Sequence, residues 1–367
     1  MKRPAVRCGE PRSPEAHLTA FGWVLTGEMA IEETVPVATC AVTVLLTQPA
    51  YELSATLRRL WKLEEVAAER VPTPDKDRSE EHFQKTHFRD ATGRYVVRLP
   101  CNLDRLGQLG ESRSAALSML LGSERRLARK PELKKRYTDF MVKYLALEHM
   151  NPVPAGAPRP SVSYYLSHHA VFKAHDPSGK IRVVFNASFQ TSSGHSLNDC
   201  LLPGLRLQSD LWVILTRWRK FQVGFMADIV KMFRQIRVNP EDVDLQRILW
   251  CASPAESVRE FRLQTVTYGT TSASFLAIRT LTQLARDEAM RFPLGATALL
   301  QHSYVDDILA GGDEPTAARE VQLQLVALLQ AGGFALGKWA ANARKLLPQT
   351  SPESTPLPAF DDVSALG

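Results

Sequence analysis

Short apolar runs alternate with turn residues over the first 50 positions. The runs at residues 22–27 and 35–46 are rich in β-branched residues, which predicts strands. The second run is too short to cross a bilayer. Residues 1–50 are therefore expected to form a small β module.

The next hundred positions have mainly helical patterning. Leucines recur at helical spacing over residues 51–70, and residues 112–149 are helical in composition, with an interruption at a single proline. Proline and aspartate over residues 71–78 predict a break. Residues 80–99 predict a helix start, a turn and a strand. We expect residues 51–150 to be a helical connector region.

A proline-rich segment follows. Residues 151–161 hold four prolines, so no helix can run through them, and we place the main boundary there. Beyond it, strands are predicted at residues 167–172, 180–185, 223–229, 248–251, 260–264 and 334–339, helices at 209–221, 271–290 and 316–329, and a strand–turn region at 303–311. Helices segregated against an antiparallel sheet predict an α+β fold over residues 151–345, followed by a loose tail at 346–367.

Composition places the chain among folded proteins with an anionic partner. Hydrophobic residues make up 44% and charged residues 23%, which argues against wholesale disorder. The net charge of +6 favours a polyanionic partner. The cations are densest over residues 124–136, and a solvated helix face and a phosphate-binding face explain this run equally well.

The cysteines and histidines do not indicate a metal site or a disulfide framework. The five cysteines are scattered and odd in number, which predicts reduced thiols in an intracellular protein. The first 15 residues are polar and contain three prolines, so they are neither a signal peptide nor a membrane span. The histidines at 82, 87, 168 and 169 lack the partners of a zinc site and are interpreted as structural.

Two acidic positions interrupt apolar strands. Asp228 ends the run at residues 223–229, and Asp306 and Asp307 lie within the run at 303–309. Adjacent aspartates in apolar surroundings repel each other, and a divalent cation would remove that penalty. Magnesium prefers such oxygen ligands, and two ions about 4 Å apart can drive an in-line phosphoryl displacement. The simpler alternative is an exposed hairpin with aspartates at its tip.

The neighbouring motifs favour the first interpretation. The string YVDD at residues 304–307 resembles the polymerase signature of reverse transcriptases, and Asp228 lies 306 − 228 = 78 positions earlier. The chain resembles more specifically the Bel/Pao class of long-terminal-repeat retrotransposon polyproteins. The stretches that carry this resemblance are 93–100 (GRYVVRLP), 180–188 (KIRVVFNAS), 196–199 (SLND), 265–269 (TVTYG) and 332–339 (GGFALGKW).

This resemblance implies a reverse-transcriptase-like palm and fingers with three catalytic aspartates. Asp228 and Asp306 would hold two Mg²⁺ ions, or Mn²⁺, with Asp307 as a nearby carboxylate and Ile229 offering its backbone carbonyl. The implied activity is RNA-directed DNA polymerase. Its partners would be an RNA or DNA template with a primer and deoxynucleoside triphosphates, with no membrane involved. The expected location is cytoplasmic, in a virus-like particle, or nuclear.

The resemblance also implies a nucleotide site. Lys180 and Arg182, two positions apart on one strand face, would meet the triphosphate, although an exposed strand face is the alternative. Phe233 falls at the position of the sugar gate, or else is a core phenylalanine. Tyr268 and Gly269 open the motif at which backbone approaches the nucleotide. One further residue, Lys338, would protonate pyrophosphate or is a surface lysine.

Some features depart from the family pattern. Asn186 stands where aspartate is common, and Leu205 replaces a frequent proline. Residues 21–27 resemble the tail of the preceding aspartic protease, but no Asp-Thr-Gly or Asp-Ser-Gly precedes them, so no protease activity is expected. A thumb, a ribonuclease H domain and an integrase would normally follow, so a fragment is expected.

Two other functions compete with a polymerase. The first is a truncated, catalytically inactive remnant that binds nucleic acid, which the expected lack of a thumb and Asn186 favour. The second is another palm-fold enzyme such as a nucleotide cyclase. Such an enzyme lacks the fingers element of Lys180 and Arg182 and the sugar-gate position, which argues against this alternative.

Overall fold

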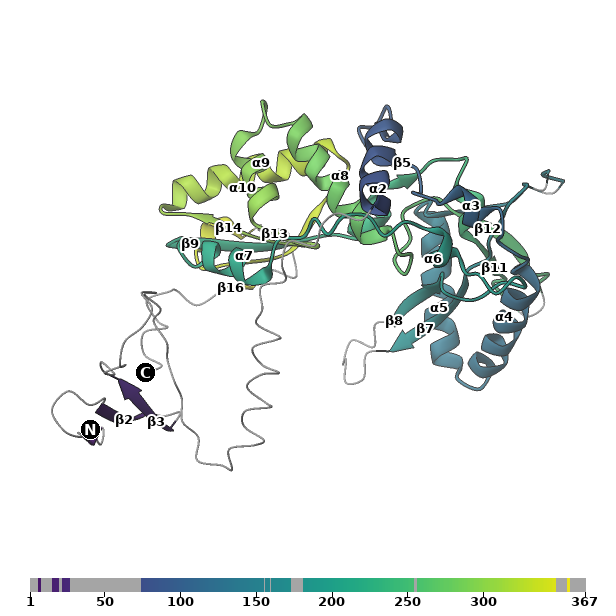
Figure 1. Cartoon of the computed structure of the whole chain (residues 1–367), viewed down its shortest axis with the longest axis horizontal. Coiled ribbons are helices and arrows are strands. Elements are labelled where there is room, and N and C mark those ends of the chain that lie inside the picture. Colours follow the sequence, from purple (N-terminus) through teal and green to yellow (C-terminus); the bar gives the residue numbers. More distant parts are fainter. Residues whose placement is uncertain are drawn as a thin grey trace, which may run out of the picture. The chain divides into compact units, whose positions relative to one another are not determined.

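The chain divides into two compact units. Figure 1 shows a computed structural model that describes residues 6–7, 15–19, 22–26, 74–154, 156–158, 160–172, 181–253, 256–347 and 355–356. The units are Met1–Val71 and Pro72–Gly367. The proline-rich segment predicted as the main boundary lies inside the second unit, where no described residue of it is helical. The four-part division of the chain stays a prediction.

The first unit contains a three-stranded antiparallel sheet. Its strands are β1 (Val6–Arg7), β2 (Glu15–Thr19) and β3 (Gly22–Thr26), in that order. The strand predicted at residues 22–27 is therefore confirmed. The strand predicted at 35–46 and the helix predicted at 51–70 lie outside the described residues.

The second unit alternates helices and strands. The helices are α2 (Pro74–Thr86), α3 (Leu103–Leu106), α4 (Arg113–Ala128), α5 (Pro131–Ala146), α6 (Leu197–Cys200), α7 (Leu211–Trp218), α8 (Ala273–Asp287), α9 (Pro293–Gln301) and α10 (Pro315–Ala331), with 3₁₀ helices η1 (Met232–Gln235), η2 (Val243–Gln246) and η3 (Arg344–Leu346). The strands are β4 (Phe88–Arg89), β5 (Tyr95–Val97), β6 (Met150–Pro152), β7 (Ser167–Phe172), β8 (Ile181–Asn186), β9 (Val223–Ile229), β10 (Arg237–Val238), β11 (Arg247–Trp250), β12 (Arg259–Leu263), β13 (Ser303–Tyr304), β14 (Asp307–Gly312), β15 (Leu336–Ala341) and β16 (Thr355–Pro356).

The largest sheet has the order β13-β14-β9-β15-β16, and β9 pairs antiparallel with both of its neighbours. Helices cover both faces. A side chain at Gly312 would meet the backbone of Ala318 on α10, whereas one at Gly311 would meet Phe221, just after α7. Successive strand residues point to opposite faces, so α10 and α7 lie on opposite sides of the sheet. The predicted α+β class, an antiparallel sheet backed by helices, is confirmed.

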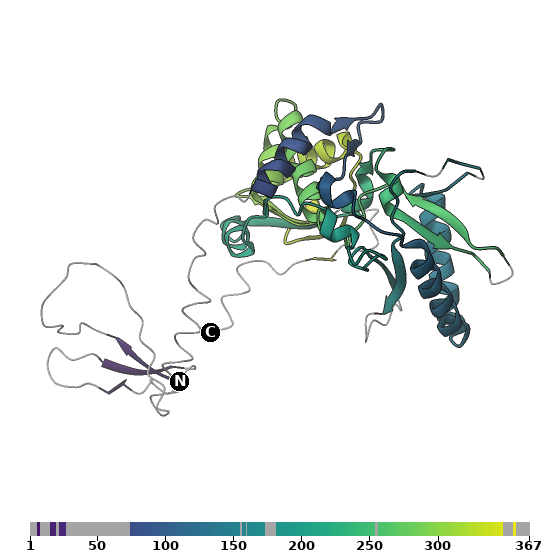
Figure 2. The same cartoon turned by 45° about the vertical axis from the view of Figure 1, so that its right-hand side comes forward.

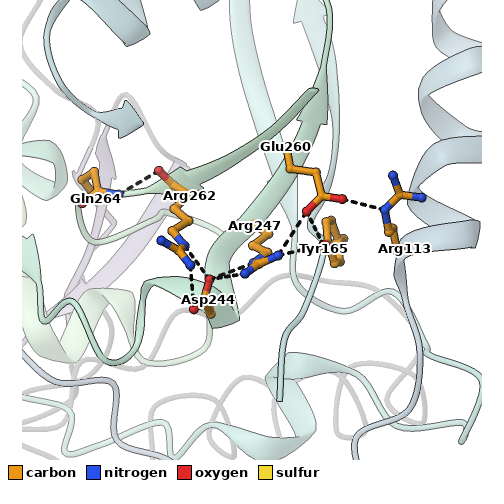
Figure 3. Close-up of polar contacts among 7 residues, drawn as sticks. All are labelled: Arg113, Tyr165, Asp244, Arg247, Glu260, Arg262 and Gln264. Carbon is orange, nitrogen blue, oxygen red and sulfur yellow. Dashed lines mark hydrogen bonds and ion pairs between the residues drawn. The ribbon is translucent and has the colours of Figure 1, made fainter. Parts of the chain in front are cut away.

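Three smaller sheets complete this unit; the strands β7, β8, β11 and β12 lie near α4 and α5, whereas β5 lies near α2 (Figure 1). The three sheets are the β7–β8 hairpin, the order β11-β12-β6 and the order β10-β5-β4. A partly buried ionic network ties the second of these to the segment before β7 (Figure 3). Asp244 binds Arg247 and Arg262 at 2.7 and 2.6 Å, and Glu260 binds Arg247 and the Tyr165 hydroxyl at 3.1 and 2.6 Å.

One local prediction was wrong. Residues 71–78 were expected to be a break, but α2 begins at Pro74. Proline is compatible with the first position of a helix, where its missing N–H has no partner to lose. Asp75 and Asp77 in the first turn interact favourably with the helix dipole. Pro131 begins α5 for the same reason, which is the interruption predicted in the helical region.

Two further predictions concern the cysteines and membrane-spanning helices. Cys101, Cys200 and Cys251 are free thiols, as expected. Within the described part of the chain, no helix is both long and apolar enough to span a membrane.

Candidate active site

The three aspartates predicted to act together converge at one end of the central sheet. Asp228, the penultimate residue of β9, is the direct cross-strand partner of Asp307, the first residue of β14. Directly opposed residues in a sheet share one face. The Ile229 N–H donates a hydrogen bond of 2.6 Å to the backbone carbonyl of Asp306. This ladder brings together residues that lie 77 and 79 positions apart in the chain.

The turn between β13 and β14 holds an unusual backbone conformation. Val305 has a φ of 56°, in the left-handed region that β-branched residues rarely adopt. The Gln208 side chain fixes this turn from outside the sheet. Its Oε1 accepts from the Val305 N–H at 2.8 Å, and its Nε2 donates to the Ser303 carbonyl at 3.1 Å. Sequence reasoning missed Gln208, because a single glutamine in a loop carries no recognisable signal.

Lys338 occupies the approach to Asp228. Its Nζ donates a hydrogen bond of 2.7 Å to Asp228 Oδ2, and the Asp228 side chain is only 17% exposed. Lys338 also has a left-handed backbone, with a φ of 51°, at an irregularity of the β15 ladder that begins at Gly337, the partner of Asp228. The predicted lysine therefore belongs to the site, in contact with a carboxylate.

The charges of the site perturb each other. Burial raises the pKa of the Asp307 carboxyl, and the neighbouring charges of Asp306 and Asp228 raise that pKa further, whereas Lys338 lowers it. The hydrogen bond to Asp228 raises the pKa of the Lys338 ammonium group. Repulsion among the carboxylates shows that negative charge gathers here and that a cation would be favoured.

The residues present match the chemistry of a magnesium site but are not arranged as a finished one. Carboxylate oxygens are the ligands that Mg²⁺ prefers. However, within the described residues, no group of three or more His, Cys, Asp or Glu side chains is already positioned to hold a metal ion. The Lys338 ammonium instead partners Asp228. A metal ion at Asp228 would compete with this ammonium group for the carboxylate.

The predicted nucleotide-binding residues are only partly described. Arg182 lies exposed on β8, and its charge lowers the pKa of the Tyr268 hydroxyl, although burial leaves that pKa raised overall. Tyr268 donates to the Val183 carbonyl, which ties it to the same strand. Gly269 has a φ of 98°. Lys180 lies outside the described residues.

Asn198 anchors the turn that contains Gly269. Its Nδ2 donates to the Gly269 carbonyl at 3.1 Å, and its Oδ1 accepts from the Thr271 N–H at 2.8 Å. Asn198 lies within the SLND stretch, so the sequence held a signal for it, but no role was assigned. A Cβ at Gly269 would lie 2.4 Å from the Phe185 carbonyl, so this position requires glycine on both steric and conformational grounds.

The other predicted residues lie at the end of β9, in η1 just after it, and at the end of β8. Phe233, in η1, is half-buried and packs against the core, as both alternatives for it allow. Ile229 is fully buried. Asn186 Oδ1 accepts from the Ser188 N–H at 2.9 Å, so this departure from the family pattern has a local structural partner.

Comparisons with known proteins found similarity in structure only. No protein-family model and no curated protein matches the chain. Among solved structures, native prototype foamy virus protease-reverse transcriptase matches with a TM-score of 0.40 and 15% identity over 56% of this chain. The CSH mutant of the same protein matches with a TM-score of 0.38 and 15% identity. The chain spans about a quarter of the length of these structures, since 24% of each is covered.

Proposed function

We propose that the chain is an RNA-directed DNA polymerase that adds deoxynucleotides to a primer 3′-hydroxyl. The observation that carries the proposal is the cross-strand pairing of Asp228 with Asp307, next to the bond between Ile229 and Asp306. An exposed hairpin with aspartates at its tip would not need a third carboxylate opposite it. The ordered sequence stretches favour the Bel/Pao class among reverse transcriptases.

Each residue of the site would have a separate role in the reaction. Bound Mg²⁺ would supply the charge that activates the primer hydroxyl and stabilises the leaving pyrophosphate. Asp228 and Asp306 would hold the cations, with Ile229 adding its carbonyl and Asp307 adding charge from the same sheet end. Lys338, released from Asp228, would offer a proton to the leaving group, because its ammonium group lies beside these carboxylates.

The nucleotide would lie between the sheet and the β7–β8 hairpin. Lys180 and Arg182 would meet the triphosphate, and Phe233 would exclude a ribose 2′-hydroxyl. Tyr268 and Gly269 would let the backbone approach the base, which fits the left-handed conformation at Gly269.

A second candidate is a catalytically inactive remnant that binds nucleic acid. The ion pair between Lys338 and Asp228 favours it, because this pair neutralises a carboxylate that the metal needs. Asn186, in place of a common aspartate, also favours it.

A primer-extension assay separates the two candidates. The full chain would be supplied with a primed RNA template, deoxynucleotides and Mg²⁺, alongside Asp306→Asn and an exposed-carboxylate control, Asp313→Asn. We expect the parent and the control to extend the primer and Asp306→Asn to lose about a hundredfold or more in rate. Equal extension by all three proteins, or none by any, would reject the polymerase proposal.

A further inference from the structure

A solvent-open cavity of about 580 Å³ lies between α4, the start of α5 and β7. Figure 1 and Figure 2 show the α4–α5 pair alongside the β7–β8 hairpin. None of the residues of the candidate active site lines this cavity. We refer to it as the α4–β7 cavity.

Cations form one rim of the α4–β7 cavity. Arg126, Arg129 and Lys130 line it, and an adjoining cavity of about 550 Å³ shares Arg126 and Arg129 and adds Arg125. Residues four positions apart on a helix lie about 6 Å apart along its axis. The two cavities therefore share a row of positive charge that runs from the last turn of α4 into the residues directly after it.

This positive charge is not neutralised by nearby carboxylates. Glu124 is engaged by Lys134, at 2.9 Å, in a pair whose side chains are 16% and 22% exposed. No aspartate or glutamate is among the described residues that line the two cavities. A helix C-terminus favours a cation, but only to the extent of about half a unit charge. The remaining positive charge of these arginines and Lys130 would favour binding of an anion.

The rest of the α4–β7 cavity combines apolar side chains with two buried hydroxyls, of Ser123 and Ser167, and with the imidazoles of His168 and His169. Ser123 accepts a hydrogen bond of 3.4 Å from Arg126. Met119, Leu127 and Leu133 contribute apolar surface. Ser167, which also lines the cavity and is 5% exposed, has a hydroxyl without a hydrogen-bond partner. Buried polar groups are normally paired, so this hydroxyl indicates a missing polar partner.

The His168 imidazole has no free nitrogen with which to bind a ligand in the cavity. Both of its ring nitrogens are engaged, with the Tyr137 hydroxyl and with the Leu249 carbonyl. Burial lowers the pKa of its imidazole, which adds no positive charge to the cavity.

We propose that the α4–β7 cavity binds a single strand of nucleic acid, with phosphates on Arg126, Arg129 and Lys130. One base would lie on the apolar surface of Met119 and Leu127. The proposal goes beyond the polymerase function, because binding here requires none of the three aspartates. A strand fits better than a free nucleotide, since the cations continue into the adjoining cavity whereas one nucleotide would engage one cavity alone.

The experiment measures binding of the full chain to a short labelled single strand of RNA or DNA by fluorescence anisotropy, without Mg²⁺. The test variant is Arg126→Ala/Arg129→Ala/Lys130→Ala. The control, Arg219→Ala/Arg286→Ala/Lys345→Ala, removes the same charge from exposed positions elsewhere. We expect the test variant to lose about tenfold or more in affinity and about 2 from the slope of log affinity against log salt. The control should change each far less.

Three results would overturn the proposal. The first is equal weakening by test and control variants, which would show a general effect of net charge. The second is unchanged binding by the test variant. The third is displacement of the strand by a free deoxynucleoside monophosphate at matched phosphate concentration, which would assign the cavity to single nucleotides. Because the assay contains no metal and works equally with Asp306→Asn, its outcome is independent of polymerase activity.

Ser167→Ala provides a second variant that does not depend on charge. Removing an unpaired buried hydroxyl should leave the melting temperature unchanged or raised, whereas binding should weaken several-fold. A purely structural serine would show the reverse, a lowered melting temperature with unchanged binding, and that result would remove Ser167 from the site.

Discussion

Lys338 and Asp228, 110 positions apart, form a hydrogen-bonded ion pair of 2.7 Å at the point where the three aspartates converge. The ammonium group therefore stands where a divalent cation would be needed. We predict that Lys338→Gln raises the affinity for Mn²⁺ about tenfold, because a competing cation is removed. Paramagnetic resonance of Mn²⁺ measures this, with the exposed Lys345→Gln as control. Lower affinity in Lys338→Gln would show that the lysine does not compete.

Asp307 should give the site a pH dependence. The pKa of its carboxyl is raised in the folded state by burial and by Asp306 and Asp228. Protons therefore compete with a bound cation at higher pH than an ordinary aspartate would allow. We expect Mn²⁺ affinity to fall as the pH decreases through this raised pKa, and Asp307→Asn to remove that step. A pH titration with identical profiles for both proteins would contradict this assignment.

The same raised pKa has a consequence for stability. A carboxyl that binds its proton more tightly when folded stabilises the protein at low pH, and this contribution is lost as the pH rises through the folded pKa. At neutral pH the charged Asp307 is then unfavourable without a cation. Because Asp307 is exposed and Lys338 offsets part of the repulsion, we predict that Asp307→Asn raises the melting temperature of the metal-free protein only slightly. A lowered melting temperature would contradict the claim that Asp306 and Asp228 repel the charged Asp307 carboxylate.

Gln208 should support activity without touching the reacting groups. It holds the backbone on both sides of the β13–β14 turn, at Ser303 and Val305. We predict that Gln208→Ala lowers the primer-extension rate about tenfold and the free energy of unfolding by about 1 kcal/mol, as the Val305 N–H loses its partner. The exposed Gln190→Ala is the matched control and should change neither quantity. Full activity in Gln208→Ala would show that the β13–β14 turn keeps its conformation without the Gln208 hydrogen bonds.

The ionic network of Figure 3 should contribute strongly to stability. Asp244 binds Arg247, whose side chain is only 5% exposed. We predict that Asp244→Ala lowers the free energy of unfolding by about 3 kcal/mol, because it removes one of the two carboxylates that pair with the buried Arg247 and the carboxylate that pairs with Arg262. The exposed pair of Asp75 and Arg78 provides the control, since Asp75→Ala should cost less than about 1 kcal/mol. Urea titrations compare the two, and equal losses would argue against burial as the cause.

We predict opposite effects on stability when each of two glycines is replaced by alanine. Gly269→Ala should destabilise the protein by about 1–3 kcal/mol, because φ is 98° and the new Cβ would meet the Phe185 carbonyl. Gly122→Ala, within α4 and with open space around it, should stabilise by about 0.5–1 kcal/mol. Thermal unfolding measures both, and a neutral Gly269→Ala would show that the turn can shift.

The sequence predicted the strands that carry the site better than the side-chain contacts that hold those strands and turns in place. β7 and β9 have the predicted bounds, since alternating or continuous apolar runs are local signals. The convergence of Asp228 with Asp307 followed from the resemblance and from the strand ends. Gln208 and the Asp244 network could not be predicted, because their roles depend on contacts between residues far apart in the chain and leave no periodic pattern.

Backbone strain is unevenly distributed in the second unit. Among the described residues other than glycine, four have positive φ, and three of them, Lys231, Val305 and Lys338, lie directly beside the end of the sheet that carries the aspartates. Each such residue costs about 1–3 kcal/mol. The end of the sheet where charge is concentrated is thus also the end where strained backbone conformations gather among the described residues. We therefore expect a cation that neutralises the carboxylates there to offset part of this conformational cost, so that occupancy of the site also stabilises the end of the sheet.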